Sequence, residues 1–242
     1  MNGTTVALVT GANKGIGHEI ARGLAATGAT VLVGARDPGR GAVAAEKLVA
    51  EGLRAVPVEL DVTDPVSVSA LAARIDREYG RLDILVNNAG VLLERGQAPS
   101  LAPVELLRRT YDTNVLGVVQ VTNALLPLIR RSPAGRIVNL SSGLGSLTLT
   151  SDPGHRYAQA PLLAYNSSKS ALNAVTVSYA NELRSTPIKV NAADPGYCAT
   201  DLNGHSGPRT PGQGAVAAVR LATLPADGPT GGFFSEDGPE PW

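Results

Sequence analysis

The segment VALVTGANKGIG, residues 6–17, decides the fold that we expect for this chain. It opens with a short apolar run, typical of a buried strand, and continues into three glycines directly before a helical pattern. Glycines in such a turn permit tight backbone geometry and the close approach of a pyrophosphate, and the helix start offers free N–H groups. The segment therefore predicts the first strand–turn–helix unit of a nucleotide-binding sheet, with an ordinary structural turn as the alternative.

Short apolar runs alternate with longer helical patterns along the rest of the chain. We expect strands at Val6–Thr10, Thr30–Ala35, Ala55–Leu60, Ile84–Val86, Arg136–Leu140, Lys189–Ala193 and Gly232–Ser235, and helices near 15–27, 40–51, 66–79, 103–130, 163–184 and 211–224. The strands are apolar on both faces, as in a parallel sheet covered by helices. The pattern predicts an α/β fold: a Rossmann-type, doubly wound parallel sheet of about seven strands with helices on both faces. No linker or repeat divides residues 1–242, which we interpret as a single dinucleotide-binding and catalytic domain.

Composition restricts the classes of protein that we consider. Hydrophobic residues make up 43% and charged residues 17% of the 242, which is typical of a folded globular chain. Basic and acidic residues both number 21, so nothing favours nucleic acid or an anionic membrane as a partner, and we interpret the arginines at 108, 109, 130, 131 and 136 as solvated helix ends. The single cysteine, Cys198, excludes an internal disulfide, and no signal segment or long apolar run is present. We expect a cytoplasmic protein, with no bound metal.

Tyr165 and Lys169 stand four residues apart in a predicted helix and therefore share one helical face. An ammonium beside a phenol favours the phenolate and should lower the tyrosine pKa from its ordinary value of about 10. A tyrosine tuned in this way can exchange a proton with a substrate oxygen near neutral pH. Such a pair also arises by chance roughly one time in ten, as an ordinary surface pair.

The glycine spacing Gly-x-x-x-Gly-x-Gly, combined with Tyr-x-x-x-Lys, resembles the short-chain dehydrogenase/reductase family. Further positions match the family in the same order over most of the chain: Asp61 with Val62, Asn87-Asn88-Ala89-Gly90, Asn114, Ser141-Ser142, and Pro195-Gly196 with Thr200. The resemblance implies a cofactor site formed by Gly11, Asn13, Lys14, Gly15, Ile16, Gly17, Arg36, Asp61, Val62, Asn88, Ala89, Gly90, Tyr165, Lys169, Pro195, Gly196, Cys198 and Thr200.

The resemblance also implies catalytic roles for Asn114, Ser142, Tyr165 and Lys169. Tyr165 is expected to protonate a carbonyl oxygen as hydride arrives, and Lys169 to lower the Tyr165 pKa and hold the nicotinamide ribose. A serine hydroxyl is expected to stabilise the developing alkoxide; the family pattern favours Ser142, with Ser141 as the alternative. Asn114 is expected to hold a water that links Lys169 to solvent. Because no histidine partner is evident for Cys198, we interpret it as a wall of the cofactor site rather than a nucleophile.

Arg36, at the end of the second strand, bears on which dinucleotide is bound. Arginine at this position suits a ribose 2′-phosphate, whereas an acidic residue suits the 2′-hydroxyl, and we expect Lys14 to add a second positive charge nearby. Asp37 could serve the hydroxyl instead, but the proline that follows it suggests a turn residue. The sequence therefore favours NADP(H).

The stretch between Ser142 and Tyr165 is about ten residues longer than in simple members of the family. This insert, roughly Leu147 to Pro161, and Tyr197 after the Pro-Gly motif are similar to the monomeric carbonyl reductases, so we expect a monomer or weak homodimer. Tyr157, Leu162 and Tyr197 could line an apolar substrate pocket. We interpret the protein as an NADPH-dependent reductase of a ketone, aldehyde or quinone-like carbonyl. The alternatives are an NAD(P)-dependent alcohol dehydrogenase, a ketoreductase for carrier-bound 3-oxoacyl chains and a non-catalytic dinucleotide sensor.

Overall fold

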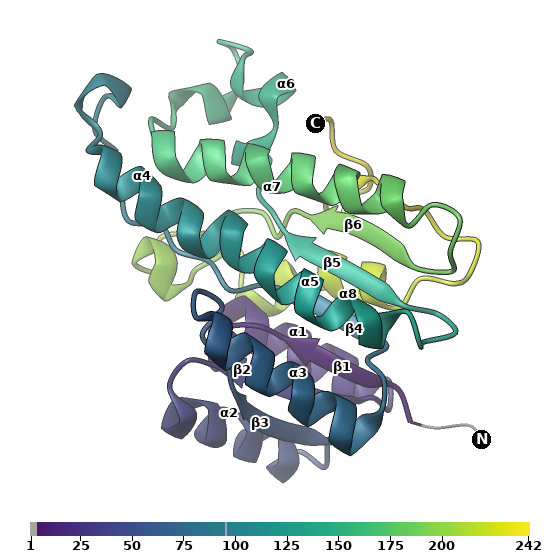
Figure 1. The fold of residues 1–242 in the computed structure, drawn as a ribbon. Helices are drawn as coiled ribbons and strands as arrows, with labels where there is room; N and C mark the ends of the chain where they lie inside the picture. The colour runs from purple at the N-terminus through teal and green to yellow at the C-terminus, as the bar shows by residue number, and fades with distance from the viewer. Residues whose placement is uncertain (1–3, 95) are drawn as a thin grey trace.

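The computed structural model describes residues 4–94 and 96–242, which form a seven-stranded, entirely parallel sheet flanked by helices (Figure 1). The strand order is β3-β2-β1-β4-β5-β6-β7. The order reverses between β1 and β4, and ligands bind at such a switch point in doubly wound sheets. The strands are β1 (Val6–Val9), β2 (Thr30–Ala35), β3 (Ala55–Glu59), β4 (Ile84–Asn87), β5 (Arg136–Leu140), β6 (Lys189–Ala193) and β7 (Phe233–Phe234). Each predicted strand is present, with boundaries within one residue of those expected.

Helices cover both faces of the sheet. Successive residues of each strand point to opposite faces, so they pack into two separate hydrophobic cores. In β1, Val9 packs in a core with α1 (Gly15–Ala26), α2 (Pro38–Ala50) and α8 (Pro211–Ala222). Leu8 packs on the opposite face with α3 (Pro65–Tyr79), α5 (Gly117–Ile129) and the end of α7 (Leu163–Glu182). The predicted doubly wound sheet is therefore confirmed. Among the described residues, no helix is both long enough and apolar enough to cross a membrane.

The helix predicted over 103–130 is interrupted. It consists of α4 (Val104–Tyr111), a π-helical segment η2 (Asp112–Leu116) and then α5. A π segment adds one residue to a helical turn, and such segments are frequent at functional sites. Asn114, which the sequence places among the catalytic residues, lies in the middle of this segment.

Residues 143–161 and 197–210 contain short helices. The first holds η3 (Gly143–Gly145), α6 (Leu147–Thr150) and η4 (Arg156–Gln159), and the second holds η5 (Asp201–Asn203). A further short helix, η1 (Pro99–Leu101), precedes α4. The insert lies over α7 in Figure 1, and the carbonyl oxygen of Gly145 accepts a hydrogen bond of 2.9 Å from the Ser170 hydroxyl of α7.

Arg136 corrects one expectation. Its side chain is buried rather than solvated, and its guanidinium donates to the carbonyl oxygens of Leu224, Pro225 and Pro187. Arg136 thus joins the start of β5 to the ends of two distant segments. A sequence pattern cannot distinguish such a buried arginine from a solvated one, because the carbonyls that satisfy it are distant in sequence.

Candidate active site

The turn after β1 is fastened to the turn after β4. The Thr10 hydroxyl accepts hydrogen bonds from the backbone N–H groups of Asn88, at 3.0 Å, and Ala89, at 2.9 Å. In return, the Asn88 amide donates to the carbonyl oxygens of Thr10 and Gly11, at 2.8 and 3.1 Å. Gly11 has a φ of +63°, and a Cβ there would lie 3.0 Å from Ala89 Cα. The structure therefore brings together two of the predicted cofactor motifs, in a turn that requires glycine.

The N-terminus of α1 is open toward this turn. Lys14 occupies the N-cap with an extended backbone, no side chain caps the helix, and its first turn holds no acidic residue. A Cβ on Gly17 would lie 2.3 Å from the Asn88 amide nitrogen, so glycine is needed for the close contact. The free N–H groups of Gly15, Ile16 and Gly17 are suited to an anionic group such as a pyrophosphate.

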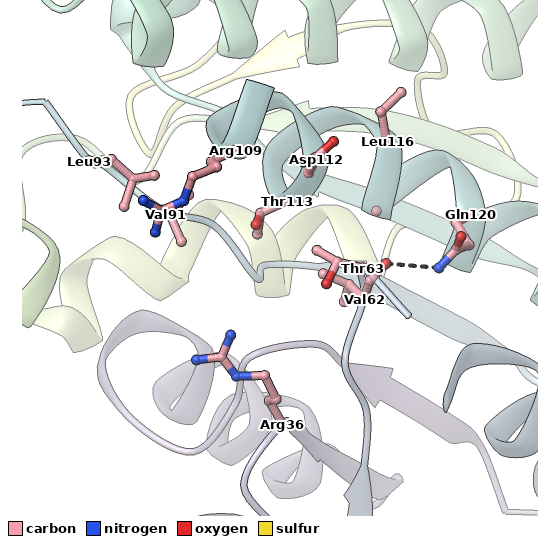
Figure 2. Close-up of a pocket in the computed structure, with 11 residues that line it drawn as sticks. Arg36, Val62, Thr63, Val91, Leu93, Arg109, Asp112, Thr113, Leu116 and Gln120 are labelled. Carbon is pink, nitrogen blue, oxygen red and sulfur yellow. Dashed lines mark hydrogen bonds between the residues drawn. The ribbon is translucent and has the colours of Figure 1, made fainter. Parts of the chain in front are cut away.

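A cavity of about 590 Å³ lies between the ends of β2 and β3 and the helical segment that contains Arg109 and Gln120 (Figure 2). Arg36 and Arg109 enter it from opposite walls, and neither guanidinium has an ion-pair partner among the described residues. Val62 lines the cavity between them, and its carbonyl oxygen accepts a hydrogen bond of 3.1 Å from the Gln120 amide. The cavity thus offers apolar contact and two guanidinium groups, beside the Asp112 carboxylate that also lines it. The two guanidinium groups are suited to the phosphorylated adenosine end of a dinucleotide.

Arg109 is a residue that sequence reasoning missed, because it was interpreted as a solvated helix end. A signal was present: Arg109, Thr113, Leu116 and Gln120 recur at helical spacing, and all line the cavity. Their shared face becomes visible only when the cavity side of the helix is known.

Two acidic residues near the cavity are already engaged. Asp37 caps α2, since its carboxylate accepts the Arg40 N–H at 3.0 Å, and it forms an ion pair of 3.7 Å with the Arg40 side chain. Asp61 accepts hydrogen bonds from the N–H and the hydroxyl of Thr63, at 2.9 and 2.7 Å. The interpretation of Asp37 as a turn residue agrees with this geometry.

Lys14 does not add a second positive charge beside Arg36, although the sequence led us to expect one. Its ammonium does not line the cavity that holds Arg36; it forms an ion pair with exposed Asp201 in η5. Asp201 also pairs with His205, at 2.7 Å between the carboxylate and Nε2. The pair therefore links the glycine turn to the loop after β6, a contact between residues far apart in sequence that no local pattern predicts.

At the end of β5, the predicted reacting groups lie together. The Tyr165 hydroxyl is hydrogen-bonded to the Ser142 hydroxyl. The Lys169 ammonium lies 5.6 Å from the centroid of the Tyr165 ring and donates to the Leu140 carbonyl oxygen at 2.7 Å. Ser141 points elsewhere, because its hydroxyl donates to the Asn173 side chain at 2.6 Å. Of the two serines, only Ser142 is placed to contact an oxygen held by Tyr165.

Asn114 is fully buried and connects the loop after β4 to α7. Its side chain accepts the Val91 N–H at 2.8 Å and donates to the Val91 carbonyl and the Ser168 hydroxyl, each at 3.0 Å. These three hydrogen bonds fix the position of α7 relative to the Gly90 turn.

Glu94, which sequence reasoning missed, holds the start of α7. Its buried carboxylate accepts the backbone N–H groups of Ala164 and Tyr165, both at 2.9 Å. A carboxylate at a helix N-terminus satisfies free N–H groups and interacts favourably with the helix dipole. The sequence carries a partial signal, since Leu162 at the N-cap cannot cap the helix and an acceptor from elsewhere is therefore required.

The pKa values of the pair correct the expectation that Lys169 lowers the pKa of Tyr165. Burial, reinforced by the charge of Asp194, raises the pKa of Tyr165 to about 12, while the Ser142 hydrogen bond acts in the opposite direction. Burial lowers the pKa of Lys169 to about 8, against the effect of Asp194. Burial disfavours charged forms, so it favours a neutral phenol and a neutral amine. At neutral pH Tyr165 is therefore protonated.

The loop after β6 completes the opposite wall. Cys198 is buried, its thiol contacts the Pro195 carbonyl oxygen at 3.2 Å, and burial raises its pKa. A protonated, buried thiol agrees with a wall residue rather than a nucleophile. A Cβ on Gly15 would lie 3.6 Å from the Thr200 methyl group, so this loop reaches the glycine turn.

The expected apolar substrate pocket does not form as predicted. Tyr157 and Tyr197 line a second cavity, of about 260 Å³, but Leu162 does not. Charged side chains dominate its walls: Arg156, Asp194, Arg209, Glu236, Asp237 and Glu240. The Tyr157 ring packs where a Cβ on Gly143 would be, 2.4 Å from its Cε2, so the insert contacts the residue next to Ser142.

Comparisons with known proteins agree with this geometry. A family model described as short chain dehydrogenase matches residues 5–210. The chain is 36% identical to the (-)-isopiperitenone reductase of Mentha piperita, with 96% of each chain covered. It is also 36% identical to carbonyl reductase (NADPH) 1 of Mus musculus, with 98% of each covered. The NADPH-bound carbonyl reductase from chicken fatty liver superposes with a TM-score of 0.85 at 28% identity, over 100% of both chains. The predicted resemblance is confirmed.

We expect Lys169→Met to stabilise the fold at neutral pH. The ordinary lysine pKa of 10.5 falls to about 8 in the fold, so the charged form destabilises the folded state fully below pH 8. That penalty disappears as the pH rises from 8 to 10.5. After allowing for the lost bond to Leu140, the gain in unfolding free energy should be about 1–3 kcal/mol at pH 7 and smaller at pH 10, measured by urea denaturation.

Lys47→Met, at an exposed position of α2, is the control and should change the unfolding free energy by less than about 0.5 kcal/mol. A Lys169→Met variant that is less stable than the parent at both pH values would contradict the prediction, because the bond to Leu140 would then outweigh the burial of the charge.

Proposed function

The chain belongs to the short-chain dehydrogenase/reductase family of oxidoreductases, and on that premise we propose that it reduces the carbonyl group of a small molecule to an alcohol with NADPH. The substrate class is a ketone, aldehyde or quinone-like compound. The observation that carries the proposal is the hydrogen-bonded Ser142–Tyr165 pair with Lys169 beside it, at the edge of the sheet that also holds the glycine turn. In this proposal residues 1–242 act as one dinucleotide-binding and catalytic domain.

The proposed roles of Tyr165, Ser142 and Lys169 follow from their protonation states. Bound NADPH would supply the hydride, and the carbonyl carbon would receive it. Tyr165, protonated at neutral pH, gives its proton to the carbonyl oxygen as negative charge develops there. The Ser142 hydroxyl donates a hydrogen bond to the same oxygen and stabilises that charge. Lys169, with a pKa of about 8, is mostly protonated near neutral pH and can return a proton toward Tyr165 after turnover.

Asn114 supports this chemistry by fixing α7 against the loop after β4, through Val91 and Ser168. Because proton transfer requires donor and acceptor within hydrogen-bond reach, the position of Tyr165 matters as much as its pKa. The family role of holding a water near Lys169 is part of the proposal.

The preference for NADPH over NADH is proposed from the charges around the large cavity. Arg36 presents a guanidinium there that has no ion-pair partner within residues 4–94 and 96–242, whereas the Asp37 carboxylate is occupied by the N-terminus of α2. A guanidinium can bind a phosphate through two parallel hydrogen bonds, and a committed carboxylate is not free to bind a ribose hydroxyl. Two of the similar proteins, the mouse and chicken carbonyl reductases, carry NADPH in their names. The single cysteine, which leaves no internal disulfide, supports action in a reducing compartment such as the cytoplasm.

We propose that the protein is a monomer or weak dimer, because the insert occupies part of α7. Asn166 of α7 donates to the carbonyl oxygen of Ala160, in the insert, at 3.0 Å. Ser170 donates to that of Gly145, in the η3 turn directly before the insert, at 2.9 Å. A helix face covered in this way is not free for helix-to-helix association. Light scattering at micromolar concentration should give a mass below that of a tetramer, and a stable tetramer would contradict this part of the proposal.

Replacing Tyr165 by phenylalanine tests the reaction. NADPH consumption should first be followed with menthone, 4-nitrobenzaldehyde and menadione as ketone, aldehyde and quinone probes. On the best of them, Tyr165→Phe should lower kcat about 100-fold or more, because the proton donor is lost, while the Kd for NADPH stays within a few-fold. Tyr179→Phe, on the same helix, is the control and should leave kcat nearly unchanged. Full activity in Tyr165→Phe would defeat the mechanism.

Replacing Arg36 by alanine tests the cofactor. The loss of a charged phosphate contact should weaken NADPH binding by about 1.5–3 kcal/mol and NADH binding far less. The measurement is the Kd of each dinucleotide by fluorescence titration. Arg108→Ala removes a charge from α4 at a residue that does not line the cavity, and it should alter neither Kd. An equal effect of Arg36→Ala on both dinucleotides would overturn the NADPH assignment.

A further inference from the structure

Asp194 is a buried carboxylate between the two turns that would face the substrate. It follows β6 directly, precedes Pro195–Gly196 and is only 6% exposed. Its carboxylate accepts the Gly196 N–H at 2.9 Å and also the N–H of Gly143, the residue after Ser142. The Ser141 N–H donates to the Ala193 carbonyl at 2.8 Å, so the carboxylate extends the pairing of β5 with β6 past the ends of both strands.

No cation forms an ion pair with Asp194 among the described residues. The charge of Asp194 acts on Tyr165 and Lys169 of α7 and on Cys198 after β6. The charged and titratable side chains that line the same cavity as Asp194 are Arg156, Tyr157, Tyr197, Arg209, Glu236, Asp237 and Glu240. A buried carboxylate is costly unless its oxygens are hydrogen-bonded, and here two backbone N–H groups provide those bonds. The two amides compensate the charge only in part: burial raises the pKa of Asp194 against their effect. In its ionised form the carboxylate acts on the neighbouring side chains.

We propose that Asp194 is a positioning residue of the reaction, which locks the Ser142–Gly143 turn against the Pro195–Gly196 turn and presents a negative charge to the Tyr165–Lys169 pair. The proposal rests on the proposed function, since it assigns Asp194 a part in proton delivery by Tyr165. None of the family positions that match this sequence includes it.

The charge of Asp194 acts in one direction on both members of the pair. A fixed negative charge disfavours a nearby phenolate and favours a nearby ammonium. Asp194 accordingly raises the pKa of Tyr165 and also that of Lys169. Both groups retain their protons to higher pH than burial and their other neighbours alone would allow, so the acid form needed for carbonyl reduction persists over a wider range.

The substitution Asp194→Asn tests the effect of the negative charge with little change in the size of the side chain. Asparagine keeps the size of the side chain and one carbonyl oxygen for the Gly196 N–H, but removes the negative charge. The kcat for the best of the three carbonyl probes, with saturating NADPH, should be measured across pH. The alkaline limb of the profile should move to lower pH by about one unit, because Lys169 and Tyr165 both lose their protons more easily.

A second readout does not depend on turnover. The near-ultraviolet absorbance of tyrosinate, with the signal of the matching Tyr165→Phe protein subtracted, reports the titration of Tyr165 alone. Its onset should also move to lower pH in Asp194→Asn. Asp237→Asn is the matched control: it removes an exposed carboxylate from the lining of the same cavity, and neither the profile nor the titration should change.

The outcomes are distinguishable. An unshifted profile and an unshifted tyrosinate titration in Asp194→Asn would overturn the proposal, even if kcat falls, since a purely structural role lowers activity without moving the pH dependence. A wild-type protein that reduces none of the probes would defeat the proposed function, while the tyrosinate titration would still test the effect of the charge. If Asp194→Asn does not fold, Asp194→Ser, which keeps a small hydroxyl acceptor, takes its place under the same criteria.

Discussion

The Thr10 hydroxyl, which accepts two backbone N–H groups from the turn after β4, is the contact on which the site depends. β1 and β4 are neighbours at the point where the strand order reverses, so their turns diverge unless something joins them. From this contact a chain of hydrogen bonds runs along the loop after β4. Asn114 binds Val91 and Ser168, and Glu94 binds the N–H of Tyr165 itself. Hydrogen bonds thus connect the turn suited to the pyrophosphate with the proposed proton donor through the loop after β4.

Burial decides the protonation of the reacting pair. The ammonium of Lys169 is 5.6 Å from the centre of the Tyr165 ring and donates a hydrogen bond to a carbonyl oxygen. Lys169 is buried and Tyr165 is partly buried. The loss of hydration outweighs the attraction between ammonium and phenolate, so the pKa of Tyr165 rises instead of falling. Reduction of a carbonyl requires a neutral phenol as the acid, whereas oxidation of an alcohol requires the phenolate as the base. The neutral phenol is therefore the form that the proposed carbonyl reduction requires.

The sequence was sufficient for the elements of the fold and insufficient for the contacts between them. Strands such as Thr30–Ala35 are apolar on both faces and bounded by glycine or charged turns, so their ends could be located to within one residue. Motif residues such as Gly11 and Asn88 could be placed because their backbone geometry is local. Glu94 and Asp194 were missed because each accepts hydrogen bonds from backbone N–H groups of a segment distant in sequence. Almost every residue type has a backbone N–H group, so the sequence does not reveal which residues are the donors. The direction of the Tyr165 pKa shift was wrong for a related reason: burial is a property of the packed structure, not of spacing along a helix.

Glu94 and Asp194 have the same structural role. Each is a buried carboxylate outside the family motifs, and each holds two peptide N–H groups that border the reacting centre. A hydrogen bond from a backbone N–H to a carboxylate does not depend on the side chain of the donor residue. Such a carboxylate can therefore fix a turn even when the residue types around the turn are changed. Gly143 illustrates the consequence: Asp194 holds its N–H, the Tyr157 ring of the insert lies against its Cα, and Ser142 precedes it. Because Asp194 fixes this turn, a substitution in the insert can change the space around the Ser142 hydroxyl without moving Ser142 itself. Under the proposed function, the sheet and its carboxylates would therefore set the geometry of proton delivery, and the insert and the loop after β6 would set the choice of carbonyl compound.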